Sequence, residues 1–151
     1  MIVLDTKVLS EALKPSPSGV VLGWLAAQEP SSVFTTTITQ AEILYGIETL
    51  PAGKRRVRLS TAIEKMFAAE FEGRILPFDE DAARAFAIIV AGRSVAGRSG
   101  AGRPISQFDA MIAAIARSRM AVLATRNTAD FERCGIQIVN PWTVEPRETH
   151  S

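Results

Sequence analysis

Short apolar runs alternate along the chain with longer segments in which apolar residues recur at helical spacing. The short runs are rich in Val, Ile, Phe and Thr, a composition typical of β-strands. They predict strands over residues 2–5, 31–37, 121–125 and 136–140, with 75–78 as a further strand or an extended connector.

The longer segments predict helices that begin after polar residues and stop before prolines or loops. Their ranges are 7–13, 18–28, 39 to about 50, roughly 54–69, roughly 80–96 and one that begins at Ser106. Because helices separate most of the strands, the order is that of parallel strands joined by crossover helices. We expect an α/β fold with a mostly parallel central sheet flanked by helices on both sides; two-layer α+β packing is the weaker alternative.

Composition narrows the class of protein. A hydrophobic fraction of 47% in 151 residues is enough for one domain with a real core. The 17 basic and 16 acidic residues give a net charge of +1, so a polyanion must be met by a local patch. No basic segment typical of a signal peptide opens the chain, and its longest strongly apolar stretch, AFAIIVA, is too short to span a bilayer. We expect a soluble, cytoplasmic protein.

Cysteine and histidine are too scarce for several kinds of site. Cys134 is the single cysteine, which excludes an internal disulfide and a cysteine-rich metal site, and fits a reducing cytosol. His150, the only histidine, lies one residue from the end of the chain. Histidine general-base catalysis and a histidine-ligated zinc site are therefore disfavoured.

Four acids fall near the carboxyl ends of predicted strands, where parallel sheets bind ligands. Asp5 ends the first strand, Glu42 lies in the first turn of the helix after the second, Asp109 opens the helix before strand 121–125, and Asp130 follows that strand. Each has a structural alternative: Glu42 completes a capping box with Thr39, Asp109 suits a helix N-terminus, and Asp130 suits a turn. A carboxylate that finishes a buried strand, as Asp5 does, is the hardest to explain structurally.

If these acids converge, they need protons or a cation to remain together. Two carboxylates ~4 Å apart repel by about 4 kcal/mol at an effective dielectric near 20. Without histidine or thiolate nearby, ligation by oxygen alone points to Mg²⁺ or Mn²⁺. Such an ion activates water and stabilises a phosphate in transfer, so the residues suggest metal-dependent phosphodiester chemistry.

Six stretches, taken in order, resemble PIN-domain proteins, in particular the VapC/FitB-like toxins of bacterial type II toxin–antitoxin pairs. They are MIVLDTKVLSE, TITQAEILYGIETL, GRILPFDEDAARAFAII, GRPISQFDAMIAAIA, LATRNTADF and IVNPW. The resemblance runs from Met1 to about Trp142, so we expect a PIN domain over 1–142 and a flexible C-terminal tail over 143–151.

This resemblance implies a PIN-like three-layer sandwich and a ribonuclease that often acts on structured RNA such as tRNA. It implies a homodimer, neutralised by a VapB-like antitoxin whose other end binds operator DNA. It also implies an acidic pocket that holds Mg²⁺ or Mn²⁺. The implied catalytic residues are Asp5, Glu42, Asp109 and Asp130, with Asp5, Asp109 and Asp130 as metal ligands and Thr6, Lys7, Thr125 and Asn127 in support.

Lys7 departs from the family pattern, which usually reads L-D-T-N where this chain has L-D-T-K. An ammonium that points inward would compete with the metal ion, whereas one that extends into solvent would leave the site nearly normal. The hypothesis is that Lys7 weakens metal binding. The alternative function is then a catalytically weakened PIN domain that acts mainly as an antitoxin-binding and autoregulatory partner.

Two basic segments are candidate RNA contacts. Arg93, Arg98 and Arg103 recur every five residues in AGRSVAGRSGAGRP, and a second group lies in GKRRVR, residues 53–58. They suit phosphate contacts without base recognition, or simply a solvated helix face and a polar linker.

A phosphatase-like or phosphoacceptor domain is the rival enzyme class. However, Lys7 stands where a D-x-D motif needs its second aspartate, and no Walker-type loop occurs.

Overall fold

The computed structural model describes residues 1–98 and 105–143, and for 93–98 it describes the backbone alone. The five strands in these ranges form one sheet of order β3-β2-β1-β4-β5, and every pair is parallel. The strands are β1 (Ile2–Leu4), β2 (Val33–Thr36), β3 (Ile75–Leu76), β4 (Val122–Ala124) and β5 (Gln137–Val139). The α/β prediction is confirmed, and 75–78 contains a strand.

The helices connect these strands and cover both faces of the sheet. They are α1 (Thr6–Ala12), α2 (Gly19–Ala26), α3 (Thr37–Glu48), α4 (Lys54–Lys65), α5 (Glu80–Arg98) and α6 (Gln107–Ser118). Short 3-10 turns occupy Pro30–Ser32 and Thr128–Phe131, and a π turn occupies Met66–Glu70. No helix in the described ranges is long and apolar enough to cross a membrane.

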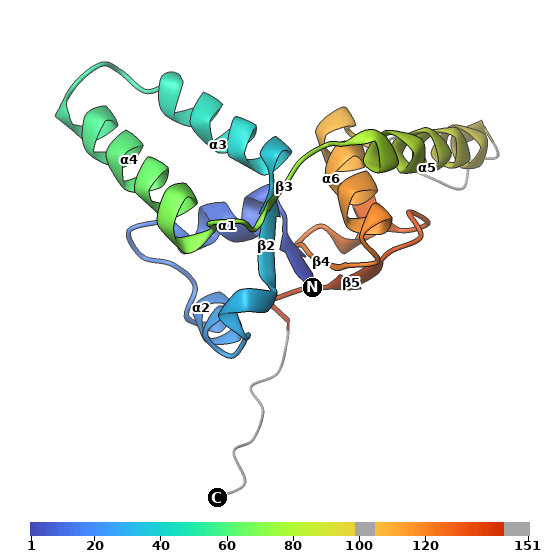
Figure 1. The fold of residues 1–151 in the computed structure, drawn as a ribbon, viewed down its shortest axis with the longest axis horizontal. Helices are drawn as coiled ribbons and strands as arrows, with labels where there is room; N and C mark the ends of the chain where they lie inside the picture. The colour runs from blue at the N-terminus through green and yellow to red at the C-terminus, as the bar shows by residue number, and fades with distance from the viewer. Residues whose placement is uncertain (99–104, 144–151) are drawn as a thin grey trace, which may run out of the picture.

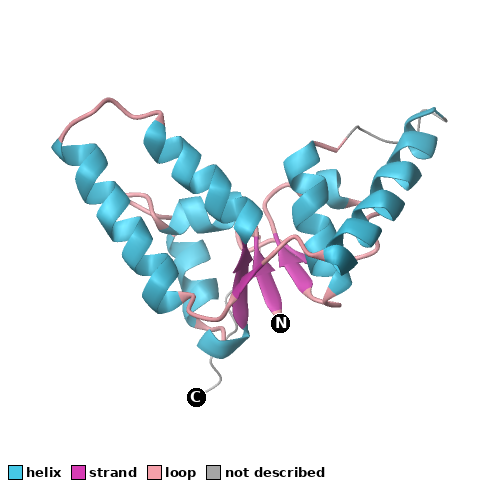
Figure 2. Ribbon diagram, turned by 45° about the horizontal axis from the view of Figure 1, so that its top comes forward, coloured by secondary structure: helices cyan, strands magenta, loops and turns pink. Residues whose placement is uncertain are grey.

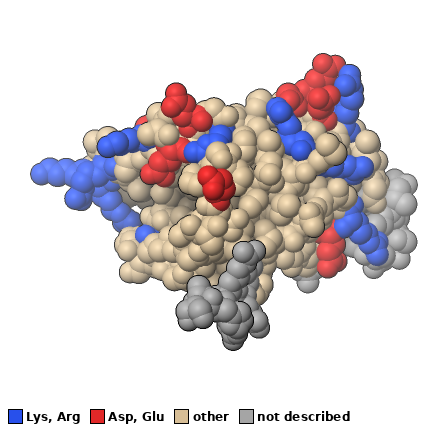
Figure 3. Space-filling model, turned by 60° about the horizontal axis from the view of Figure 1, so that its bottom comes forward, with Lys and Arg blue, Asp and Glu red and all other residues tan. Residues whose placement is uncertain are grey.

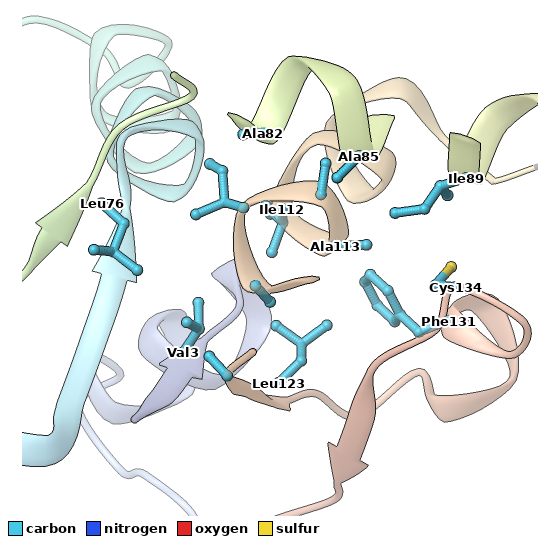
Figure 4. Close-up of a cluster of buried hydrophobic side chains, with 14 residues drawn as sticks. Val3, Leu76, Ala82, Ala85, Ile89, Ile112, Ala113, Leu123, Phe131 and Cys134 are labelled. Carbon is cyan, nitrogen blue, oxygen red and sulfur yellow. The ribbon is translucent and has the colours of Figure 1, made fainter. Parts of the chain in front are cut away.

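Strand alternation produces two cores, one on each face, and hence three layers (Figure 1). On β1, Val3 faces the core beneath α5 and α6, while Leu4 faces the core beneath α1, α3 and α4. On β4, Leu123 and Ala124 divide in the same way. Figure 4 shows the first core, where Val3 and Leu123 meet α6 and the 3-10 turn that carries Phe131.

Two helical arms diverge from the carboxyl edge of the sheet. The α3–α4 hairpin forms one arm and α5 with α6 forms the other, so that the molecule has the outline of a V (Figure 2). The strands point toward the base of this V. Residues that follow β1, β2 and β4 therefore meet where the arms separate.

Several predicted boundaries move by a few residues. The predicted strand 31–37 gives way to helix at Thr37, because Thr36 caps α3 by accepting the Thr39 N–H at 3.0 Å. The predicted helix over 54–69 is α4 followed by the π turn, and α5 runs two residues beyond the predicted 96. Of the predicted tail, 144–151 lies outside the described residues.

Thr35 offers a test of the packing of β2. It is fully buried, and its hydroxyl has no hydrogen-bond partner in the described part of the chain. We expect Thr35→Val to raise the free energy of unfolding by about 1 kcal/mol, because it removes an unsatisfied buried hydroxyl. Urea denaturation measures this. Thr36→Val is the matched control and should lower stability by about 1 kcal/mol, since that hydroxyl caps α3. A loss of stability in both variants would contradict the assignment of the Thr35 hydroxyl as buried and unsatisfied.

Candidate active site

The register of the sheet sets Asp5 beside Thr125. Leu4 pairs with Ala124, and the Asp5 N–H donates to the Ala124 carbonyl at 3.1 Å, so both strands end at the same level. The Asp5 carboxylate accepts the Val8 N–H at 3.0 Å and thereby caps α1. Asp5 is only 4% exposed. A structural role is thus present, but any Asn could also cap this helix, so capping does not explain the buried charge.

Thr6 connects the first strand to Glu42 on α3. Its hydroxyl donates to Glu42 Oε1 at 2.8 Å and lies 3.1 Å from the Thr39 hydroxyl. The structural alternative of a capping box between Thr39 and Glu42 is wrong, because Thr36 is the cap. Glu42 lies in the second turn of α3 rather than in the predicted first turn. Thr39 and Glu42, three residues apart, share the helix face that meets Thr6.

Asp109 reaches the edge from α6. Ser106 caps this helix by accepting the Asp109 N–H at 3.1 Å, which places the half-buried Asp109 in the first turn. Asp130 lies in the 3-10 turn after β4, where its N–H donates to the Asn127 carbonyl at 3.1 Å. Asp130 is half-buried and is not the cap of that turn.

Thr125 and Asn127 order the segment between β4 and Asp130. The fully buried Thr125 accepts the Asn127 N–H at 3.1 Å through its hydroxyl, and its own N–H donates to the Val139 carbonyl at 3.0 Å. Through these hydrogen bonds, Thr125 and Asn127 can fix the position of Asp130.

The ionised form of Asp5 is disfavoured by its surroundings. Burial raises the pKa of Asp5 above its ordinary value, and the nearby charge of Asp109 raises it further. Hydrogen bonds from Thr125 and from the Val8 N–H, and the charge of Lys7, act in the opposite direction. Burial outweighs them, so Asp5 is a carboxylate that lacks sufficient compensation within the protein.

The ionised form of Asp109 is disfavoured in the same way. Burial raises its pKa, the charge of Asp130 adds to the rise, and hydrogen bonding to Ser106 and the charge of Lys7 oppose it. Electrostatic coupling therefore joins Asp5 to Asp109 and Asp109 to Asp130. The structure brings these three acids into one neighbourhood, and Thr6 links Glu42 to it.

Lys7 is exposed on the first turn of α1, beside these acids. It forms no ion pair with any acid of the described residues, yet its charge acts on both Asp5 and Asp109. Its position lies between the two expected cases: the ammonium is solvated, and it still adds a positive potential at the site.

The donor set suits a hard divalent cation, although the carboxylates are not gathered into a tight cluster. No three Asp, Glu, His or Cys side chains in the described ranges lie close enough to form a ready-made metal site. Asp109 acts on Asp5 and Asp130 acts on Asp109 through unfavourable charge interactions, which a bound divalent cation would offset. Their oxygen-only chemistry, and a buried Asp5 with no ion-pair partner among the described residues, fit Mg²⁺ or Mn²⁺.

The structure does not describe the side chains of the arginines predicted to contact RNA, and it contains two hydrogen bonds at the site that were not predicted from the sequence. The side chains of Arg93 and Arg98, and the whole of Arg103, lie outside the described residues. Sequence reasoning missed the contact of Thr39 with Thr6 and the cap from Ser106. A serine three residues before an acid was an available signal for the cap. The Thr39 contact joins residues 33 apart, and no local signal indicates it.

Comparison with known proteins agrees with the fold. Residues 2–136 match the family model of the PIN domain. The chain is 40% identical over 142 residues to VapC ribonuclease Y4jK of Sinorhizobium fredii, covering 94% of this chain and 98% of that protein. It is 39% identical over 142 residues to toxin FitB of Neisseria gonorrhoeae, covering 94% of this chain and 99% of FitB.

A solved structure gives the same result for the fold. The structure of FitAB bound to an IR36 DNA fragment contains a chain that superposes with a TM-score of 0.86 at 38% identity, covering 97% of this chain and 99% of that one. The chain therefore belongs to the PIN domain family and is a homologue of the VapC and FitB toxins.

Proposed function

We propose that this protein is the toxin of a type II toxin–antitoxin pair and acts as a Mg²⁺- or Mn²⁺-dependent endoribonuclease. The observation that carries the proposal is the buried Asp5, whose pKa is raised beside Asp109 at the carboxyl edge of the sheet. Such a carboxylate costs the folded protein free energy when it is ionised, and a bound cation would offset that cost. The ribonuclease name of the Sinorhizobium relative supports RNA as the substrate.

Asp5, Asp109 and Asp130 would hold the ion, which when bound supplies an activated water and charge neutralisation at the scissile phosphate. Glu42 would orient that water or accept its proton, and Thr6 donates a hydrogen bond of 2.8 Å to the Glu42 carboxylate. Thr125 positions Asp5 by a hydrogen bond and, through Asn127, the turn of Asp130.

The same comparison supports a proposal for the partners. FitB has been solved as FitAB on DNA, so we propose that this chain also binds a small VapB-like antitoxin and reaches operator DNA only through it. We further propose a homodimer and a cytoplasmic location, as expected of this toxin family. A short reading frame for a DNA-binding protein next to the gene would support the pairing.

Expression in bacteria tests the proposal. The chain alone should arrest growth and produce cleaved cellular RNA, and co-expression of the adjacent antitoxin should restore growth. Asp5→Ala should abolish both effects and still co-purify with the antitoxin. Growth arrest that Asp5→Ala retains would show that toxicity does not come from this site.

Lys7 favours a second candidate function, that of a weakened nuclease that serves mainly to bind its antitoxin and repress transcription. The exposed ammonium adds positive potential to Asp5 and Asp109, where a divalent cation would bind. RNA cleavage by the wild-type chain at physiological Mg²⁺ that is as fast as cleavage by Lys7→Asn would exclude this function.

Lys7→Asn should strengthen Mn²⁺ binding about fivefold. The exposed +1 charge of Lys7 beside a +2 ion in water-like surroundings should cost the ion about 1 kcal/mol, which corresponds to this factor. Isothermal titration of Mn²⁺ measures it. Lys54→Asn, which removes the same charge at the start of α4, should leave Mn²⁺ affinity unchanged. Equal Mn²⁺ affinity of wild type and Lys7→Asn would show that Lys7 does not influence the ion.

A further inference from the structure

We propose that the start of α4 binds phosphates of the RNA that is cleaved at the acidic edge, an inference that rests on the proposed nuclease function. The site consists of Lys54, Arg55, Arg56 and Arg58, named here the α4 basic cluster. It lies at the tip of the α3–α4 arm, where Figure 3 shows basic side chains projecting from the left end of the molecule.

The charges of this cluster are largely uncompensated. Lys54, Arg55 and Arg58 are exposed, and none forms an ion pair with an acid of the described residues. Arg56 is the exception, with its guanidinium 2.5 Å from Glu48 Oε2. Gly53, Lys54, Val57 and Arg58 also line an open hollow of about 630 Å³, so two of the free cations border a concave surface.

This arrangement is unfavourable for the helix itself. The N-terminus of a helix carries a partial positive charge, so cations in the first turn reduce its stability. Gly53 provides no side-chain cap, and the first turn of α4 contains no acid to offset the charge. Cations that weaken their own helix indicate a function outside the fold, and three free cations match a polyanion.

The start of α5 shows how the same chain builds a helix without such a role. Glu80 and Asp81 occupy its first turn, and Asp79 caps it by accepting the Ala82 N–H at 3.0 Å. Arg84, one turn later, lies 2.8 Å from Glu80 and 3.5 Å from Asp81. Its charge is neutralised within α5, whereas those of Lys54, Arg55 and Arg58 are left for a partner.

The α4 basic cluster lies far from the acidic edge, so its role in binding RNA can be separated from catalysis. The 12 residues of α3 carry the chain ~18 Å from the acidic edge to the hairpin turn before α4. That exceeds two Debye lengths of ~8 Å at physiological salt, so the cluster exerts little potential on the metal site. An RNA strand that lies along this arm would contact both places. Loss of the cluster should therefore raise KM and leave kcat and Mn²⁺ affinity unchanged.

The test compares two triple variants that remove the same charge. One is Lys54→Gln, Arg55→Gln and Arg58→Gln in the cluster; the control is Lys65→Gln, Arg84→Gln and Arg119→Gln elsewhere. Affinity for fluorescein-labelled bulk tRNA is measured in EDTA over a range of salt concentrations. The cluster variant should bind at least tenfold more weakly near 0.1 M salt, with a log–log salt dependence shallower by about two, since each phosphate contact contributes ~0.7–0.9.

Thermal melting and kinetics complete the test. The melting temperature of the cluster variant should be unchanged or higher, and the control should bind tRNA within threefold of wild type. Equal losses in both variants, an unchanged affinity of the cluster variant, or binding of polyglutamate in place of tRNA would overturn the inference. Because binding is measured without metal, wild type that binds tRNA through the cluster but cleaves no RNA would overturn the proposed function alone. Cleavage with an unchanged KM in the cluster variant would overturn this inference alone.

Discussion

Asp5→Asn is expected to reduce RNA cleavage at least ~100-fold while raising the stability of the metal-free protein by about 1 kcal/mol. Asparagine is also a good N-cap, so the hydrogen bond from the Val8 N–H is retained. What disappears is the buried charge, which costs the folded state free energy and which the metal ion requires. A higher melting temperature together with a lost Mn²⁺-induced stabilisation is the expected signature.

The stability gained by Asp5→Asn should depend on pH in a defined direction. Because burial raises the pKa of Asp5, the folded state binds its proton more tightly than the unfolded chain does. The cost of ionised Asp5 is fully present above the raised pKa and is relieved as pH falls through that value toward the ordinary one. The stability gap between Asp5→Asn and wild type should therefore shrink as the pH is lowered toward about 4.

Asp79 supplies the matched control, since it caps α5 as Asp5 caps α1. Asp79→Asn keeps a cap at a partly exposed position, where the carboxylate lies 3.5 Å from Arg119, and should alter neither cleavage nor the response to Mn²⁺. If Asp5→Asn destabilised the metal-free protein, or if both variants lost cleavage equally, the special role of Asp5 would be refuted.

Phe131→Ala should produce the largest loss of stability, about 3–5 kcal/mol and a fall in melting temperature of roughly 10 °C. Phe131 is 1% exposed and packs beneath α6 beside Cys134 (Figure 4). It follows Asp130 directly in the 3-10 turn, so the cavity also loosens a proposed metal ligand. Mn²⁺ affinity should fall together with stability, as measured by titration and thermal melting.

Phe108 allows the same substitution at an exposed position. It is 56% exposed near the start of α6, and Phe108→Ala should change the free energy of unfolding by less than about 1 kcal/mol. Similar losses in the two variants would mean that the core beneath α6 is not organised around Phe131.

Much of the fold was predictable because each element carries its own local pattern. The runs at Ile2–Leu4, Val122–Ala124 and Gln137–Val139 are short, apolar and separated from other strands by helical or turn-forming segments. The helices between most successive strands then make parallel pairing the natural topology. The four acids stood out by their positions near the ends of predicted strands, and the resemblance to PIN domains added their implied roles, which no single motif indicates.

The boundaries of α3 and the contacts of the site were harder to predict for physical reasons. Thr35, Thr36 and Thr37 are alike in propensity, so only the tertiary position of Thr36 decides which one caps the helix. The contact between Thr6 and Glu42 joins residues 36 apart, and the strand register that creates it is not encoded locally. Lys7 was recognisable as a departure, but its solvated position depends on the packing of α1.

The central claim, that one acidic edge cleaves RNA with a bound divalent ion, is tested most directly by the purified chain acting on bulk tRNA. Cleavage is measured with Mn²⁺, then with excess chelator, then after Mn²⁺ is restored, for wild type beside Asp5→Asn and Asp79→Asn. We predict cleavage by wild type and Asp79→Asn that stops in chelator and returns with Mn²⁺, and none above background by Asp5→Asn. Cleavage that persists in chelator, or that Asp5→Asn retains, would contradict the claim.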